Sequence, residues 1–324
     1  MRRRVTLVFA FGLIITACSP DSETATSSTD TATSTMVTTS TTTTGQQTTT
    51  TGAVSTTSTS VPATTTTVES TTSTTEETGT WADLPLVVAG FGALGWWDGS
   101  DWVSAEDAGE LPVIGGESYQ IAGIGLEATT TGGEQTLVCE PLNNLGVQLQ
   151  NEQLLGDWPG PYGVAVSAPW VIQPNLFEAF EDDGTYSALA SSLLADRGLD
   201  VPQPVIKQLF RTDLEGDGTN EVLVVAEDLP NWYLPEAGAY SIAFMRKVIQ
   251  GDVQTAVLGA TAITDSEGAF VVGYSIGSVA DLSGDSRMEI VVSAAYYEGL
   301  AVEVWEYVDD DIGPFKYLEA GCGS

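Results

Sequence analysis

The sequence Asp213-Leu-Glu-Gly-Asp217-Gly-Thr-Asn-Glu221 is an acidic loop that runs directly into the apolar segment Val222-Leu-Val-Val225. A second segment of the same form, Asp281-Leu-Ser-Gly-Asp285-Ser-Arg-Met-Glu289, runs into Ile290-Val-Val-Ser293. A glycine at the fourth position of each lets the backbone turn inward. The β-branched segment that follows indicates a strand. We call these segments loop one (213–221) and loop two (281–289) and expect each to join two strands.

Both loops carry oxygen-bearing side chains at positions 1, 3, 5 and 9. This spacing allows a tight loop to wrap a hard cation, with the carbonyl of the seventh residue as a further ligand. The predicted calcium ligands are Asp213, Glu215, Asp217, Thr219 (carbonyl) and Glu221 in loop one, and Asp281, Ser283, Asp285, Arg287 (carbonyl) and Glu289 in loop two. The alternative is a pair of acidic turns whose carboxylates accept hydrogen bonds from the loops' own backbone amides.

The two loops are 68 residues apart, and each follows the first of four expected strands. These strands are expected at 205–212, 222–227, 240–248 and 253–260, and again at 270–280, 289–295, 300–307 and 313–318. A repeat of this length, with four strands per unit, favours propeller blades over a sandwich. The predicted fold class is therefore mainly β, with β-propeller-like repeats of four-stranded units over residues 204–324.

The loops are similar to the FG-GAP/VCBS repeats, the blade units of integrin-α-like β-propellers. In that family an Asp-x-Asp/Asn-Gly-Asp-Gly-x-x-Asp/Glu loop binds calcium between two strands of a blade. Loop one matches this pattern closely, whereas loop two has Ser283 at the third position and Ser286 in place of the second glycine. The resemblance covers about residues 204–308. It implies structural calcium, held more weakly at loop two, and ligand binding through loops on a propeller face.

Residues 81–203 are expected to form an irregular β-rich half with one helix. A buried strand is predicted over 84–97, followed by a turn at 98–101 and a return strand from Trp102. Further strands are expected at 118–126, 134–139 and 162–172, and the helix at 186–197, because its leucines recur at helical spacing. Three tryptophans, Trp96, Trp97 and Trp102, surround the first hairpin. They are interpreted either as packing aromatics or as a platform for a sugar.

The first 17 residues have the form of an export signal, with three arginines before a short apolar run. Small residues then precede Cys18, an arrangement that resembles the bacterial lipobox. The resemblance implies a lipid on Cys18 and attachment to the cell membrane, facing the extracytoplasmic side; the alternative is an ordinary signal peptide and a free thiol. Residues 18–80 are dominated by Thr and Ser and are interpreted as a disordered stalk.

Charge and residue types exclude several functions. Removing residues 1–17 removes three of the ten basic residues and no acidic residue, so the net charge changes from −34 to −37. Such a field repels nucleic acid. The chain has no histidine, which excludes Ser-His-Asp and Cys-His catalysis and His-ligated zinc. In an exported chain Cys139 and Cys322 most simply form a disulfide, the alternative being two buried thiols.

These observations predict a cell-surface, calcium-stabilised, non-catalytic binding or scaffold protein whose partner is an extracellular protein or glycan. One alternative is a glycan-active hydrolase that uses paired carboxylates without histidine. Its candidate residues are the acids near the tryptophan hairpin and the triplet Asp309, Asp310 and Asp311. The other alternative is an envelope sensor or assembly partner.

Overall fold

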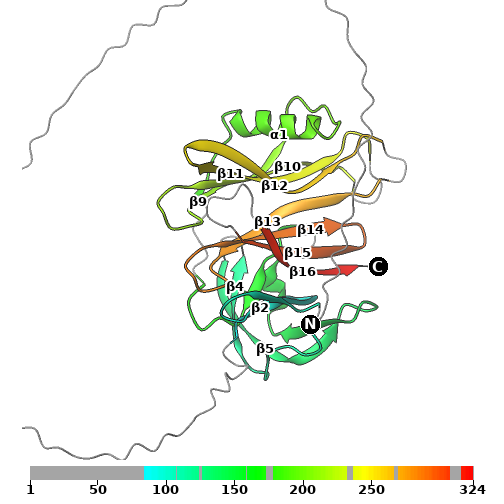
Figure 1. Ribbon diagram of the computed structural model, residues 1–324. Helices are drawn as coiled ribbons and strands as arrows, with labels where there is room; N and C mark the ends of the chain where they lie inside the picture. The colour runs from blue at the N-terminus through cyan, green and yellow to red at the C-terminus, as the bar shows by residue number, and fades with distance from the viewer. Residues whose placement is uncertain are drawn as a thin grey trace, which may run out of the picture. The chain divides into compact units, whose positions relative to one another are not determined.

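The computed structural model describes residues 84–106, 108–123, 126–157, 159–172, 178–231, 236–265, 269–306 and 315–323. All of them belong to one compact unit, Ser73–Ser324. The predicted export signal, Cys18, the Thr/Ser-rich stalk and Asp309–Asp311 lie outside the described residues. The described part is mainly β, as the sequence predicts, and forms three antiparallel sheets (Figure 1).

The first sheet has seven strands in the order β3-β2-β1-β7-β4-β5-β6. Its strands are β1 (Leu86–Ala89), β2 (Gly92–Trp97), β3 (Trp102–Ser104), β4 (Ser118–Gly123), β5 (Leu126–Val138), β6 (Asn144–Leu149) and β7 (Val164–Val166), with a short 3₁₀ helix at Glu152–Leu155. The sheet curls on itself: Asn144 Nδ2 at the start of β6 donates a hydrogen bond to the carbonyl of Phe91 beside β2 at 3.2 Å. The sheet therefore brings its last strand back toward its second.

The second and third sheets contain the two predicted four-stranded units: the second adds the short β8 to the meander β9–β12, and the third is the meander β13–β16. The second sheet has the order β12-β11-β10-β9-β8 and the third the order β13-β14-β15-β16. Their strands are β8 (Glu178–Ala179), β9 (Ile206–Thr212), β10 (Glu221–Asp228), β11 (Tyr240–Ile249), β12 (Asp252–Ala262), β13 (Val272–Ala280), β14 (Glu289–Tyr296), β15 (Gly299–Glu306) and β16 (Phe315–Gly323). All eight strands predicted for residues 204–324 are present, with small differences at their ends.

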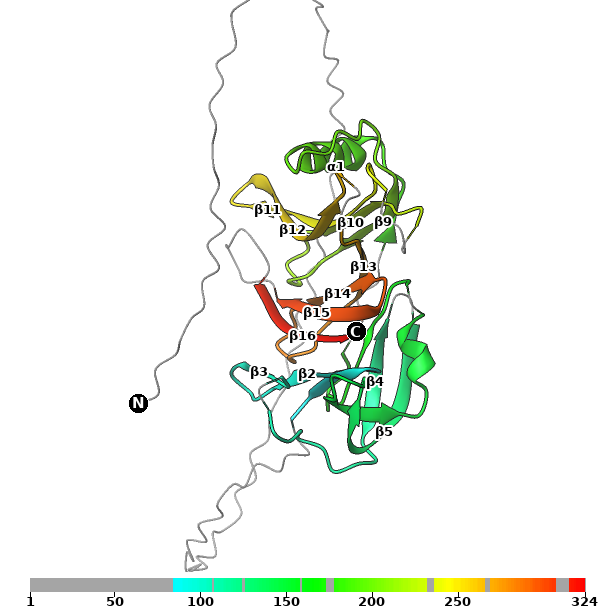
Figure 2. The ribbon, with the colours of Figure 1, turned by 90° about the vertical axis from the view of Figure 1, so that its right-hand side faces the viewer.

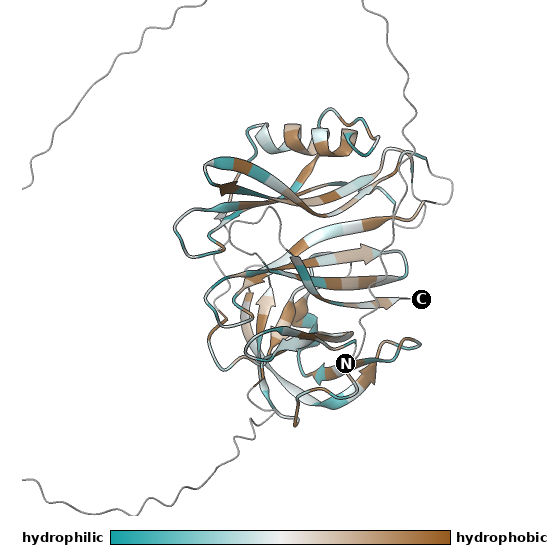
Figure 3. Cartoon of the chain, viewed as in Figure 1, coloured by the Kyte–Doolittle hydropathy of each residue, from teal (hydrophilic) through white to brown (hydrophobic). Residues whose placement is uncertain are grey.

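The third sheet packs between the first and second sheets, because successive side chains of its strands point to opposite faces and both faces are apolar. Ile290 and Val292 face Leu223 and Met245 of the second sheet, whereas the intervening Val291 joins the core of the first sheet. In both views β16 lies beside β2 (Figures 1 and 2). Hydrophobic residues accordingly run along the stacked strands, while many connecting loops are hydrophilic (Figure 3).

The predicted helix is α1 (Thr185–Ala195), and it covers the outer face of the second sheet. Its Leu194 packs with Val224 and Phe244. The Asp182 carboxylate accepts the backbone N–H groups of Gly184, Tyr186 and Ser187 at 2.9–3.0 Å and so caps the first turn. Although the helix precedes residue 204 in the sequence, it packs on the first of the two repeats.

Three expectations for the N-terminal half are corrected. The single strand expected over 84–97 is two strands, β1 and β2, with a tight turn at Gly90 and Phe91. The strand expected over 162–172 is reduced to β7, and the strand expected over 134–139 is the end of the longer β5. The strand β6 was not predicted. The turn at 98–101 is confirmed by a hydrogen bond from Asp98 N to Asp101 O at 3.1 Å.

Candidate functional site

Loop one is folded around the carboxylate of its first residue. Asp213 Oδ1 accepts the backbone N–H groups of Gly216 at 2.8 Å and Asp217 at 3.1 Å, and its Oδ2 accepts that of Gly218 at 2.9 Å. Asp217 Oδ1 in turn accepts the N–H of Thr219 at 2.6 Å. These are the local side-chain-to-backbone bonds that hold acidic turns. These contacts match the alternative stated above, in which the loop carboxylates accept hydrogen bonds from the loop's own backbone amides.

The last acid of loop one is buried beneath it. Glu221 is 1% exposed, and its Oε2 accepts the backbone N–H of the fully buried Leu214 at 2.9 Å. Burial, together with the charge of Glu215, raises the pKa of Glu221 to about 7. Glu221 thus fastens the start of the loop to the start of β10.

Loop two repeats these contacts. Asp281 accepts the N–H groups of Gly284 at 2.6 Å and Ser286 at 3.1 Å, and Leu282 N donates to Glu289 Oε2 at 2.6 Å. Ser286 has φ 72°, in the left-handed region that Gly218 occupies in loop one with φ 85°. The serine that departs from the family pattern therefore keeps the same backbone path.

Burial is more complete in loop two. Asp281, Ser283 and Glu289 are all buried. Burial raises the pKa of Glu289 to about 8 and also raises that of Asp281. Asp285 remains exposed, and its Oδ1 accepts the N–H of Arg287 at 2.8 Å.

The two loops are joined to each other and to the first sheet. Met288 N of loop two donates to Leu214 O of loop one at 2.8 Å. On the other side of loop two, Asp281 N donates to Ile172 O at 2.9 Å, and Trp170 Nε1 donates to Asp281 O at 3.0 Å. The acidic loops therefore lie at the junctions between sheets.

Side chains reinforce the junction between the second and third sheets. The amide of Gln208 on β9 accepts from Ile276 N at 2.8 Å and donates to Ile276 O at 3.1 Å. Ser241 Oγ on β11 accepts from Tyr274 N at 2.8 Å. The edge strand β13 thus finds partners for its backbone groups on the neighbouring sheet, as buried polar groups require.

The carboxylates fit a calcium ion less well than the sequence implies. Glu215, expected as the third-position ligand of loop one, forms an ion pair with Lys247, with Nζ 2.8 Å from Oε1. Across the described ranges, no group of three or more Cys, Asp or Glu side chains is arranged to hold a metal ion. In loop one, a lysine therefore already engages one of the expected calcium ligands. In loop two the pair is looser, with Arg287 Nε 3.9 Å from Asp285 Oδ2 at the surface, so loop two is the better candidate.

The tryptophan hairpin is partly buried. Trp97 and Trp102 stack edge to face with ring centroids 5.4 Å apart, and Trp96 and Trp102 pack against the core of the first sheet. A cleft of about 510 Å³ opens beside this hairpin, between the β5–β6 turn and β16. Glu106 and Glu319 both line it, but the three tryptophans do not. Glu319 also pairs with Lys316.

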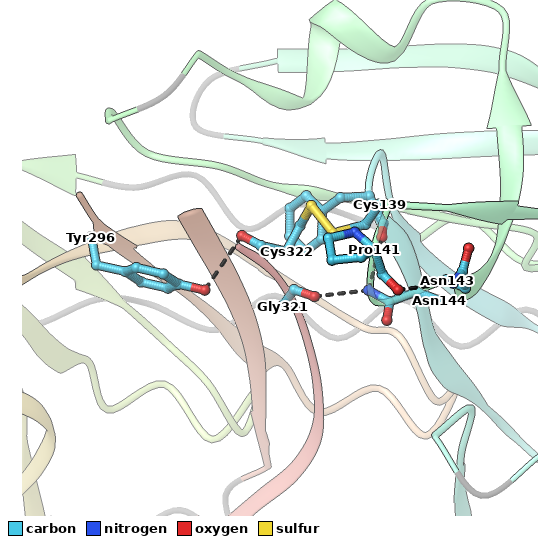
Figure 4. Close-up of a disulfide and its surroundings, with 8 residues drawn as sticks. Cys139, Pro141, Asn143, Asn144, Tyr296, Gly321 and Cys322 are labelled. Atoms are coloured by element: carbon cyan, nitrogen blue, oxygen red, sulfur yellow. Dashed lines mark hydrogen bonds between the residues drawn. A yellow bond between two sulfur atoms is a disulfide. The ribbon is translucent and has the colours of Figure 1, made fainter. Parts of the chain in front are cut away.

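The two cysteines predicted to pair are joined beside this cleft (Figure 4). The sulfur atoms of Cys139 and Cys322 are 1.98 Å apart. Asn144 Nδ2 donates to Gly321 O at 2.8 Å, and the Tyr296 hydroxyl donates to Cys322 O at 3.3 Å. The cross-link therefore connects β16 of the third sheet to the end of β5 in the first.

Two kinds of contact in the acidic loops were not predicted: the Lys247–Glu215 ion pair, and the hydrogen bonds from Leu214 and Leu282 to the buried glutamates. Lys247 lies on the third strand of its repeat, so only the strand register brings it to the loop.

The helix of the described part is too short to span a membrane. No protein-family model, curated protein or solved structure matches this chain, so its function is inferred from the geometry of its own residues.

Proposed function

We propose that this chain is a non-catalytic binding or scaffold module, attached to the cell membrane through a lipid on Cys18 and presented on its Thr/Ser-rich stalk. One observation carries the non-catalytic part of this proposal. In both loops the first and last acids accept hydrogen bonds from the loop's own backbone. Carboxylates used in this way stabilise turns and are poorly placed to exchange protons with a substrate.

The repetition supports a propeller-like scaffold. Each repeat is a four-stranded meander, and each places a loop of the same hydrogen-bond pattern between its first and second strands. The sheets also stack face to face through apolar side chains. This stacking of small sheets is how propeller blades bury their faces, so the resemblance to FG-GAP/VCBS repeats remains our proposal for the family. Such a scaffold would hold the connecting loops rigid for a partner.

The partner we propose is an extracellular protein or a glycan. The net charge of −34 disfavours nucleic acid and favours a surface that carries basic residues. A hydrolase has less support: among the described residues, no tryptophan lines the cleft of Glu106 and Glu319, and Glu319 pairs with Lys316.

Calcium is proposed for loop two. Asp281, Asp285 and Glu289 would hold the ion, with Ser283 and the carbonyl of Arg287 as further oxygen ligands. The bound ion would stabilise the junction between the third and first sheets by neutralising buried carboxylates.

Thermal unfolding of the full chain tests the calcium proposal directly. Calcium at 100 times its dissociation constant should stabilise the native state by about 2.7 kcal/mol relative to excess chelator. The matched variant is Asp285→Asn, because Asp285 is exposed and its substitution leaves the Asp281 and Glu289 hydrogen bonds intact. The variant should lose most of the calcium response. Equal midpoints of the wild-type chain in calcium and in chelator would refute a metal at loop two.

A further inference from the structure

Lys247 is a buried cation on the third strand of the first repeat. Its side chain is 8% exposed, and it follows Ala243 and Met245 on the face of β11 that packs against the third sheet. The neighbouring Arg246 points to the opposite face, where its guanidinium lies 5.9 Å from the ring centroid of Tyr186. Lys247 thus places a positive charge on the face of β11 that packs against the third sheet.

The positive charge of Lys247 stabilises the acids of loop one. Lys247 Nζ lies 2.8 Å from Glu215 Oε1, with Glu215 itself 15% exposed. Lys247 also lies close enough to Glu221 to oppose, by its positive charge, the rise that burial causes in the pKa of that carboxyl. A paired cation stabilises a buried carboxylate, which must otherwise stay protonated or bear the cost of an unpaired charge in a low dielectric.

The strand register reveals a charge difference between the repeats. On β10 and β11 Val222 lies opposite Arg246, so the next position outward places Glu221 across from Lys247. On β14 and β15 Ile290 lies opposite Trp305, so the next position outward places Glu289 across from Glu306. The position that holds a lysine in the first repeat therefore holds a glutamate in the second.

Glu306 increases the negative charge around loop two. Its pKa is raised, first by burial and then by the charge of Asp285, which places the two carboxylates within electrostatic reach of each other. Arg287 of loop two is the cation nearest these acids, with its half-buried guanidinium Nε 3.9 Å from Asp285 Oδ2. The two loops, which share the same backbone hydrogen bonds, thus differ in their buried neighbours: loop one has a lysine, whereas loop two has an additional acid.

We propose that Lys247 is the permanent cation of loop one and takes the place that a calcium ion has in the loops it resembles. Four methylenes anchor the ammonium group to β11, which is hydrogen-bonded along both edges, so loop one is neutralised without metal. A divalent ion at loop one would have to displace this ammonium from Glu215. The inference concerns loop one alone and stands or falls independently of calcium at loop two.

The test compares calcium responses of the full chain and its variants, with calcium chloride against excess chelator. Asp217→Asn should leave the wild-type calcium response unchanged, because loop one holds no calcium while Lys247 is present. Lys247→Met should unfold at a lower temperature in chelator and should gain a calcium-dependent rise in midpoint of about 5–10 °C at saturating calcium. Adding Asp217→Asn to Lys247→Met should abolish this gain.

Lys207→Met is the matched control, because Lys207 is an exposed lysine on β9 of the same sheet and its substitution removes the same charge. It should gain no calcium response. The proposal is overturned if Asp217→Asn reduces the calcium response of the wild-type chain, or if Lys247→Met gains none.

Glu215→Gln provides a second test should Lys247→Met fail to fold. The proposal expects Glu215→Gln to lower the midpoint equally in calcium and in chelator, because the lost partner is a lysine. A loss confined to calcium would show that Glu215 binds the ion, and would overturn the proposal.

Discussion

Opening the Cys139–Cys322 cross-link should reduce the free energy of unfolding by about 5 kcal/mol. The two cysteines are 183 residues apart in the sequence. In the chain-entropy model a closed loop of this length removes about 18 cal/mol/K from the unfolded state, which is about 5 kcal/mol at 25 °C. This is a large part of the 5–15 kcal/mol that is typical of a folded domain.

The native contacts near the cross-link should survive its removal. Cys322 pairs with Leu300 in the β15–β16 ladder, and Asn144 Nδ2 holds the adjacent Gly321 carbonyl. The loss should therefore arise in the unfolded chain and appear as a lower urea midpoint with the folded spectrum unchanged.

Urea unfolding of the full chain, followed by tryptophan fluorescence without reductant, measures this loss. The Cys139→Ser/Cys322→Ser double variant is compared with the wild-type chain, and each single variant serves as a control because either one opens the same loop. All three variants should lose similar stability. A loss below about 1 kcal/mol in the double variant would refute the reasoning, because it would mean that the unfolded chain already keeps these segments together.

Two further predictions concern the buried acids and the packing of the sheets. In chelator, the free energy of unfolding should fall as the pH rises from about 5 to about 8. Burial raises the pKa of Glu221 to about 7 and that of Glu289 to about 8, against an ordinary value of 4.5. Over this pH range the folded chain therefore keeps protons that the unfolded chain releases. Each group contributes up to about 1.4 kcal/mol per pH unit while it titrates; Glu289→Gln should reduce this slope, and an unchanged slope would contradict the assignment. Gly277→Ala should destabilise the chain by about 3 kcal/mol in urea unfolding, because its Cβ would lie 2.0 Å from the Tyr162 carbonyl oxygen. Gly109→Ala, which meets nothing within 4 Å, should have almost no effect, and equal losses in the two variants would exclude the predicted clash.

The repeats could be predicted because their strands are bounded by strong local signals. Loop one and loop two mark strand ends with acids and glycines, and the hairpin between β11 and β12 turns at Gln250 and Gly251, which have φ 53° and 90°. In contrast, the β1–β2 turn at Gly90 and Phe91 has no Asn, Asp or Pro to mark it. All four residues of β1 are buried, so the segment reads as one continuous apolar run instead of an alternating strand.

The acids of the candidate site could be identified from the sequence, but their partners could not. The loop spacing named Asp213, Glu215 and Glu221 as one group. Whether such a group holds a metal, an amide or an ammonium depends on what lies across the sheet, and Lys247 reaches Glu215 only through the pairing of β10 with β11. A lysine in a strand has no local pattern that distinguishes a buried counter-charge from a solvated side chain.

The position of β1 in its sheet has a mechanical consequence. Although β1 is the first strand of the described chain, it lies between β2 and β7 and is hydrogen-bonded along both edges. A pull on the segment before it would load these bonds in shear, because antiparallel ladder bonds run perpendicular to the strand and must rupture together. An edge strand would instead peel away one bond at a time. The domain would therefore resist tension if the proposed stalk before β1 transmits a pull.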